Sequence, residues 1–190
     1  MHEFRPGLEF DVEALQEYLA ARRGDLTGPL TVKQFADGQS NPTYLLTTPA
    51  STFVLRRKPP GVLLPSAHAI EREFRIMRAL GSTDVPVAQM LCLCEDEAVI
   101  GRAFYIMECV DGRVLWDQSL PGMSNEQRAA HYDEMNRVIA QLHSLDYKKL
   151  DLESYGKPGN YFGRQIDRWI HQYKAAETEH IPEMEHLIEW

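Results

Sequence analysis

Long apolar runs and paired cysteines are both missing from this sequence. No run approaches the roughly 20 apolar residues that a helix needs to cross a bilayer, and the first residues do not have the layout of a signal peptide. The three cysteines form no Cys-x-x-Cys pair, and no histidine stands at zinc-ligand spacing from them. These absences argue against a membrane partner, a disulfide scaffold and a zinc module, so we expect a cytoplasmic protein with reduced thiols.

Basic residues are also in deficit. The chain has 20 Lys and Arg against 28 Asp and Glu, a formal net charge of −8. Because nucleic-acid phosphates are neutralised by clustered Lys and Arg, we expect no nucleic-acid partner. Hydrophobic residues at 44% and charged residues at 25% are typical of a folded domain. A length of 190 residues allows one domain, or one small lobe and part of a second.

Alternating and helical patterns predict an α+β fold. We expect strands at 30–35, 43–48, 52–56, 90–94 and 104–109. We expect helices at 11–21, 70–80, 125–142 and 161–176, and a short one from Pro182. Five short strands joined by tight loops, with one helix after the third, predict an antiparallel sheet. The pattern becomes mostly helical after Asp111, so we predict one lobe over 1–110 and a helical part over 111–190.

Several short segments stand in the order that an ATP site requires. Phosphates need a loop with free backbone N–H groups and a fixed cation, which a carboxylate usually orients. Adenine needs an apolar slot beside an exposed backbone edge. The candidates are Gly38, Ser40 and Asn41 for the loop, Arg56 for the cation, Glu73 for the carboxylate, and Met107, Glu108 and Val110 for the edge.

Each candidate also has a simpler structural interpretation. The loop is a good hairpin turn and is not a Gly-Lys-Ser phosphate loop. Arg56 fits a surface arginine at a strand end, and Glu71 competes with Glu73 as the carboxylate. We expect Arg57 and Lys58 to be solvated, although the choice between Arg56 and Arg57 as phosphate ligand stays open. The joint order of these features, rather than any one of them, favours a nucleotide site.

The same segments resemble a known family. The run Asp37–Tyr44 (DGQSNPTY) resembles the nucleotide loop of aminoglycoside-phosphotransferase- and choline-kinase-like enzymes. The run Phe53–Gly61 (FVLRRKPPG) is similar to the third-strand motif of one branch, the kinase domain fused to or encoded beside certain acyl-CoA dehydrogenases. Further matching segments are IEREF at 70–74, FYIME at 104–108, and LHSL at 142–145, together with Gln165 and Trp169.

This resemblance implies both a fold and a set of roles. The fold would be a protein-kinase-like N-lobe, followed by a hinge and the first helices of an incomplete C-lobe. Arginine would replace the lysine of protein kinases, a reasonable exchange because arginine is always charged and can bind bidentately. By this resemblance, Ser40, Asn41 and Arg56 would contact the phosphates, and Glu73 would orient Arg56. Met107 and the backbone of Glu108 and Val110 would contact the adenine.

The family's catalytic loop does not occur in this sequence. That loop reads His-Gly-Asp-x-x-x-x-Asn, and the nearest segment, His143–Asp146, has the wrong spacing. We therefore predict ATP as the cofactor, with Mg²⁺ ligands outside this chain and no catalytic or metal-binding residue within it. We also expect the chain alone to be inactive, because metal ligands and proton handling contribute many orders of magnitude in rate.

Three functional hypotheses remain. The first is the nucleotide-binding part of an ATP-dependent phosphotransferase acting on a small-molecule hydroxyl, and the branch suggests a hydroxyacyl-CoA. The second is a catalytically inactive nucleotide-binding or interaction module, which would self-associate through exposed apolar helices of the partial C-lobe. The third is a fragment of an aminoglycoside- or choline-type kinase.

Overall fold

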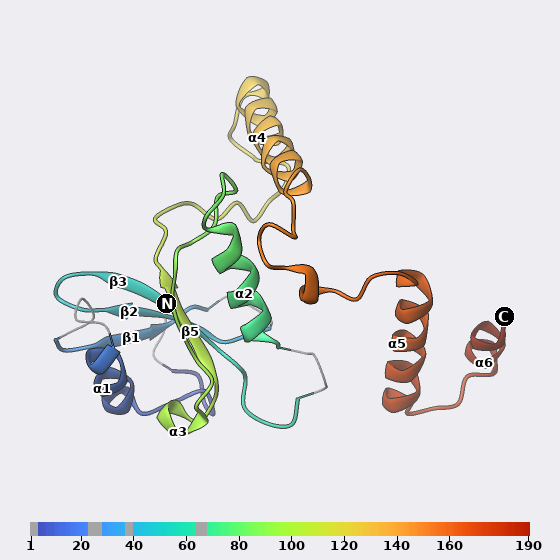
Figure 1. The fold of residues 1–190 in the computed structure, drawn as a ribbon, viewed down its shortest axis with the longest axis horizontal. Coiled ribbons are helices and arrows are strands. Elements are labelled where there is room, and N and C mark those ends of the chain that lie inside the picture. Colours follow the sequence, from blue (N-terminus) through green and yellow to red (C-terminus); the bar gives the residue numbers. More distant parts are fainter. Residues whose placement is uncertain (1–3, 23–27, 37–39, 64–67) are drawn as a thin grey trace. The chain divides into compact units, whose positions relative to one another are not determined.

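The computed structural model describes residues 4–22, 28–36, 40–63 and 68–190 (Figure 1). Contacts divide the chain into two compact units, Met1–Leu152 and Glu153–Trp190. The first unit contains α1 (Val12–Arg22), β1 (Thr31–Gln34), β2 (Thr43–Thr47), β3 (Thr52–Arg57), α2 (Ile70–Leu80), β4 (Met90–Cys94), α3 (Glu97–Ile100), β5 (Phe104–Glu108) and α4 (Asn125–His143). The second contains a 3-10 turn (Glu153–Tyr155), α5 (Tyr161–Ala176) and α6 (Pro182–Glu189).

The strands form one antiparallel sheet in the order β1-β2-β3-β5-β4. The insertion of β5 between β3 and β4 places the end of the last strand beside the third strand. Arg56 of β3 pairs with Tyr105 of β5, and Val54 pairs with Met107. Because side chains alternate across a strand, these four side chains project from one face of the sheet. The predicted α+β fold with five antiparallel strands is confirmed.

The opposite face of the sheet carries the larger apolar core. Tyr44, Leu46, Leu55, Phe104 and Ile106 are all fully buried there, against Leu15 and Leu19 of α1 and Ile100 of α3. Helices α1 and α3 lie side by side (Figure 1). Apolar packing therefore fills the described part of this face.

Helix α2 covers part of the face that carries Arg56. Its apolar residues Ile70 and Phe74 pack with Ala103 and Tyr105 in a second, smaller cluster. Ile70 and Phe74 stand four residues apart and therefore lie on one side of the helix. Helix α2 contacts β4 and β5, and Figure 1 shows it beside β5. The remainder of this face, over β2, β3 and the end of β5, is where the cavity described below lies.

Local signals at two predicted helix starts are confirmed. Asp11 Oδ1 accepts a hydrogen bond from the backbone N–H of Ala14 at 3.0 Å, as expected of an N-cap at α1. Ser124 and Gln127 form a capping box at the start of α4. In the acidic segment after β4, Asp96 caps a short helix, α3. None of the described helices has the length and apolarity required to span a membrane.

Candidate functional site

A cavity of about 590 Å³ lies over the open part of the sheet face that carries Arg56. This volume is within the range of small-molecule and cofactor sites. Its walls are mostly apolar, with a few polar groups and one cation. The lining residues are Phe35, Ser40, Asn41, Thr43, Val54, Arg56, Ala88, Met107, Glu108, Val110, Val114 and Trp116.

Arg56 and Glu73 form an ion pair at this cavity. Strand β3 directs Arg56 towards α2, and the Arg56 Nε atom lies 2.9 Å from Glu73 Oε2. About a third of each side chain is exposed, at 30% for Arg56 and 35% for Glu73. The contact is close but poorly aligned, because Arg56 Nε makes no hydrogen bond of normal geometry within the described residues. The predicted cation and carboxylate are thus neighbours, and Arg56 lines the cavity.

Asn41 is the most buried polar residue at the cavity, with 4% of its surface exposed. It stands just before β2, and its amide Nδ2 donates to Glu73 Oε1 at 3.0 Å. Its Oδ1 lies 2.9 Å from His68 Nδ1. The side chain predicted to cover phosphates is therefore engaged by two neighbouring side chains. Ser40 is exposed and lines the cavity, whereas Gly38 lies outside the described residues.

The expectation that Arg57 is solvated is wrong. Only 3% of Arg57 is exposed, and its guanidinium donates to the carbonyls of Leu8 at 3.2 Å, Glu9 at 3.4 Å and Ile100 at 3.2 Å. The guanidinium carbon also lies 5.1 Å from the ring centroid of Phe10. Burial lowers the pKa of Arg57 from its usual value. Because β-strand side chains alternate, Arg57 points away from the cavity, and Arg56 is the arginine that lines it.

Lys58 and Glu71 form a separate pair beside the cavity. Lys58 Nζ lies 2.9 Å from Glu71 Oε2, and 23% of the lysine side chain is exposed. Lys58 is therefore half-buried rather than fully solvated. Burial alone would raise the pKa of Glu71, but its backbone hydrogen bond and Lys58 outweigh this effect and hold that pKa below its usual value. Of the two competing carboxylates, Glu73 is the one that meets Arg56.

The predicted adenine edge lies along one wall of the cavity. Met107 is half-buried and lines it, as do Glu108 and the exposed Val110. The backbone N–H of Glu108 already donates to the carbonyl of Gln89 at 2.9 Å. Of the Glu108 backbone, the carbonyl is therefore the group that we still expect to bind the adenine edge. The expected adenine contact of the Val110 backbone is unchanged. These assignments stay predictions.

Several residues at or near this site were not found from the sequence, and Tyr105, His68 and Trp116 are among them. Tyr105 donates its hydroxyl hydrogen to Glu73 Oε2 at 3.1 Å, His68 contacts Asn41, and Trp116 lines the cavity with 73% of its surface exposed. Tyr105 could have been found from the alternation of β5, because it shares a face with Met107 two residues later. For His68 and Trp116, which lie outside strands, the sequence carries no such signal.

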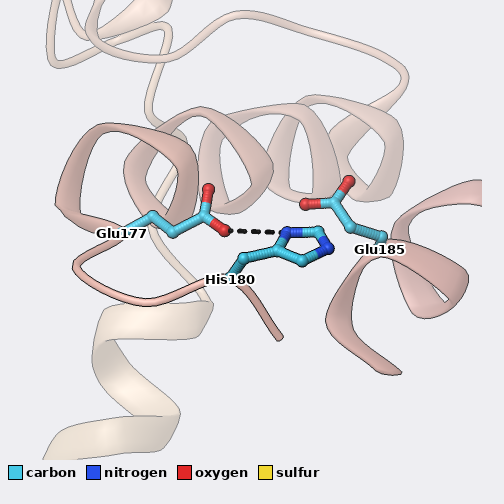
Figure 2. A group of neighbouring side chains, drawn as sticks. All are labelled: Glu177, His180 and Glu185. Atoms are coloured by element: carbon cyan, nitrogen blue, oxygen red, sulfur yellow. Dashed lines mark ion pairs between the residues drawn. The ribbon is translucent and has the colours of Figure 1, made fainter. Parts of the chain in front are cut away.

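A cluster of possible metal ligands lies in the second unit, near the turn between α5 and α6. Glu177, His180 and Glu185 bring their ligand atoms within 4.8 Å of one another (Figure 2). His180 Nδ1 lies 3.6 Å from Glu177 Oε1, and Glu185 is engaged by Lys174. His180 is exposed, with 68% of its side chain accessible, whereas Glu177 is partly buried at 23%, and acidic groups near a surface are common without an ion. The cluster is explained by these ion pairs.

The fold defines the chain as a kinase-like α+β protein. Its arginine–glutamate pair joins the sheet to helix α2. Comparison with protein-family models gives the family itself. Residues 31–190 match the model described as the phosphotransferase enzyme family (APH), so this chain belongs to that family. The predicted family is confirmed.

Relatives place the chain in a particular branch. It is 51% identical over 179 residues to mouse acyl-CoA dehydrogenase family member 10, a match that covers 94% of this chain and 17% of the relative. It is 45% identical over 192 residues to mouse acyl-CoA dehydrogenase family member 11, which covers 99% of this chain and 25% of the relative. The chain therefore spans a quarter or less of these two relatives, and the predicted link to proteins with this name is confirmed.

A solved structure shows the same fold. It comes from Ralstonia eutropha JMP134 and carries the provisional name of aminoglycoside phosphotransferase. The TM-score is 0.76 at 60% sequence identity, and the match covers 96% of this chain and 53% of that chain. The similarity therefore confirms the kinase-like fold over nearly the whole length of this chain.

Proposed function

We propose that this chain carries the ATP-binding part of a kinase that phosphorylates a hydroxyl group of a small molecule. The observation that carries the proposal is the ion pair of Arg56 with Glu73 at the edge of a mostly apolar cavity. A fixed cation beside an apolar slot suits a ligand with a charged phosphate end and a flat base. Membership of the phosphotransferase family supports the same reading.

The residues of the cavity fit ATP in both chemistry and size. Arg56 would hold the phosphates, since its guanidinium can bind two oxygens at once. The exposed Ser40 would lie at the phosphate end. Val54, Met107 and Val110 would contact the base with apolar surface. We further propose that residues 1–110 form the nucleotide lobe and that 111–190 begin the second lobe.

The described residues around the cavity do not fit Mg²⁺. Among the described lining residues Glu108 carries the carboxylate, and its Oε2 accepts from the backbone N–H of Gln89 at 3.1 Å. The neighbouring Glu73 is engaged by Arg56, Asn41 and Tyr105. Magnesium prefers oxygen ligands in near-octahedral geometry and would neutralise the phosphate charge during transfer. We therefore propose that its ligands lie outside this chain, and we assign none here.

The substrate class rests on the relatives. Two of them are named as acyl-CoA dehydrogenases, so we propose a hydroxyacyl-CoA as the phosphate acceptor of the parent protein. The name of the solved relative favours a second candidate, an aminoglycoside hydroxyl. Comparing the two compounds as acceptors with the parent protein separates these candidates. Self-association through the exposed partial C-lobe stays a prediction.

Calorimetric titration with ATP tests the nucleotide site. We expect the chain to bind ATP, and Arg56→Ala to weaken binding at least about tenfold, because it removes charge-assisted hydrogen bonds to phosphate. Lys58→Ala is the matched control, since it removes a neighbouring cation that pairs with Glu71 and does not line the cavity. Equal affinities for the unmodified chain and Arg56→Ala would remove Arg56 from the site. A chain that binds no ATP would favour an interaction module without a nucleotide.

A further inference from the structure

The carboxylate of Glu73 receives three groups from three different segments of the sheet. Arg56 Nε of β3 lies 2.9 Å from Oε2, and the Tyr105 hydroxyl of β5 donates to the same oxygen at 3.1 Å. Asn41 Nδ2, just before β2, donates to Oε1 at 3.0 Å. One carboxylate on helix α2 is therefore in contact with β3, with β5 and with the segment just before β2.

The ion pair alone is a poor orienting device. Both partners are about one third exposed, and ion pairs at that exposure are weak and screened by salt. The Arg56 Nε atom is also poorly aligned with the carboxylate. Two directional hydrogen bonds, one to each carboxylate oxygen, would hold Glu73 far better than the arginine does by charge.

The burial and position of Tyr105 suit it to donate such a hydrogen bond. Only 2% of its surface is exposed, and its ring packs 6.1 Å from that of Phe74, the residue after Glu73. It is the cross-strand partner of Arg56, so both side chains leave the sheet on the same face. Burial, and then the negative charge of Glu73, raise the pKa of Tyr105. The hydroxyl therefore keeps its proton and acts as a donor across the physiological pH range.

We propose that Tyr105, with Asn41, is a positioning residue of the nucleotide site. Tyr105 and Asn41 fix the two oxygens of Glu73, and Glu73 in turn holds the Arg56 guanidinium towards the phosphate end of the cavity. Asn41 then contributes by holding Glu73 rather than by covering phosphate. This proposal rests on the proposed function, because it assigns how the site for ATP is held in shape.

The proposal predicts different effects on a ligand with phosphate and on a ligand without it. Tyr105 reaches the ligand only through Glu73 and Arg56, and it does not line the cavity. Loss of its hydroxyl should therefore weaken ATP and leave adenosine, which has no phosphate, almost unaffected. A loss of general stability would instead weaken both ligands together.

The test is calorimetric titration of ATP and adenosine into the chain and into Tyr105→Phe. We expect ATP to bind about threefold to tenfold more weakly in Tyr105→Phe, the size of coupling usual within one hydrogen-bond network. Adenosine affinity should change less than about twofold. The ring is retained, so the packing against Phe74 is kept and the variant should fold.

Tyr44→Phe is the matched control. Tyr44 is a fully buried tyrosine of the same sheet whose hydroxyl donates to the carbonyl of Leu8 at 2.9 Å, on the other face. It loses the same atom from an equally buried site, so any general effect of removing a buried hydroxyl appears in it too. We expect its ratio of ATP to adenosine affinity to equal that of the unmodified chain.

A double-mutant cycle tests whether Tyr105 acts through Glu73. In a Glu73→Gln background, Tyr105→Phe should have a smaller effect on ATP affinity than it has alone. An unchanged ATP affinity in Tyr105→Phe, with Arg56→Ala still defective, overturns the positioning role and leaves the proposed function intact. An unmodified chain that binds neither ligand overturns both.

Discussion

At the scale of single residues, the two adjacent arginines at the end of β3 have opposite environments. Arg56 is one third exposed at the cavity, whereas Arg57 is buried and donates to three backbone carbonyls. Those carbonyls belong to Leu8, Glu9 and Ile100, so Arg57 ties the N-terminal segment and α3 to the sheet. Arg56 thus lines the cavity, and Arg57 stabilises the fold.

We predict that Arg57→Lys destabilises the chain by about 2 to 4 kcal/mol, because an ammonium cannot reproduce the fork of donors that three buried carbonyls require. Urea unfolding followed by circular dichroism gives the change in free energy. Lys58→Met is the control, and it should change stability by less than about 1 kcal/mol because its ion pair is partly exposed. Similar losses in the two variants would mean that the buried hydrogen bonds of Arg57 contribute little.

The sequence separates these arginines only in part. Alternation along a strand places Arg56 and Arg57 on opposite faces, and this much follows from the residue order alone. Which face is open depends on where α1 and α2 pack, and that is a tertiary property. Alternation along β5 also places Tyr105 on the face of Met107, but its hydrogen bond to Glu73 depends on the insertion of β5 next to β3, which the residue order does not give.

At the scale of elements, α2 carries the functional carboxylate on a helix that is fixed by its neighbours. Glu73 and Phe74 are adjacent, so the apolar stripe that packs α2 also sets the height of the carboxylate over the sheet. The helix boundaries were predictable, because apolar spacing and Gly81 mark α2 clearly. The position of the helix above β4 and β5 was not, since it depends on the long-range packing of Phe74 with Tyr105.

We predict that Phe74→Ala lowers the free energy of unfolding by about 3 kcal/mol, the usual cost of a cavity left by a buried aromatic ring. It should also weaken ATP more than adenosine, because α2 loses the contact that places Glu73. Urea unfolding and paired titrations measure the two effects. Arg78→Ala, on the exposed side of the same helix, should change stability by less than about 0.5 kcal/mol. A variant that is destabilised yet keeps the ATP-to-adenosine ratio would separate helix packing from the site.

At the scale of the whole molecule, the chain holds a nucleotide-type cavity but few of the groups that phosphoryl transfer needs. Transfer requires metal ligands and a residue that positions the attacking hydroxyl. The sequence contains no His-Gly-Asp-x-x-x-x-Asn run, and the carboxylates at the cavity are engaged by Arg56, Asn41, Tyr105 and Gln89. The match covers 53% of the solved relative, which has further chain in which such groups can lie.

We therefore predict that the 190-residue chain binds ATP without transferring its phosphate. With Mg²⁺ and a hydroxyl acceptor present, ADP release in a coupled assay should stay at the rate of the Arg56→Ala variant, which reports contaminating kinases. Small-molecule kinases turn over on the order of 1 to 100 times per second, so even a thousandth of that rate is measurable. Turnover of that size in the unmodified chain, lost in Arg56→Ala, would show that the chain supplies its own metal ligands.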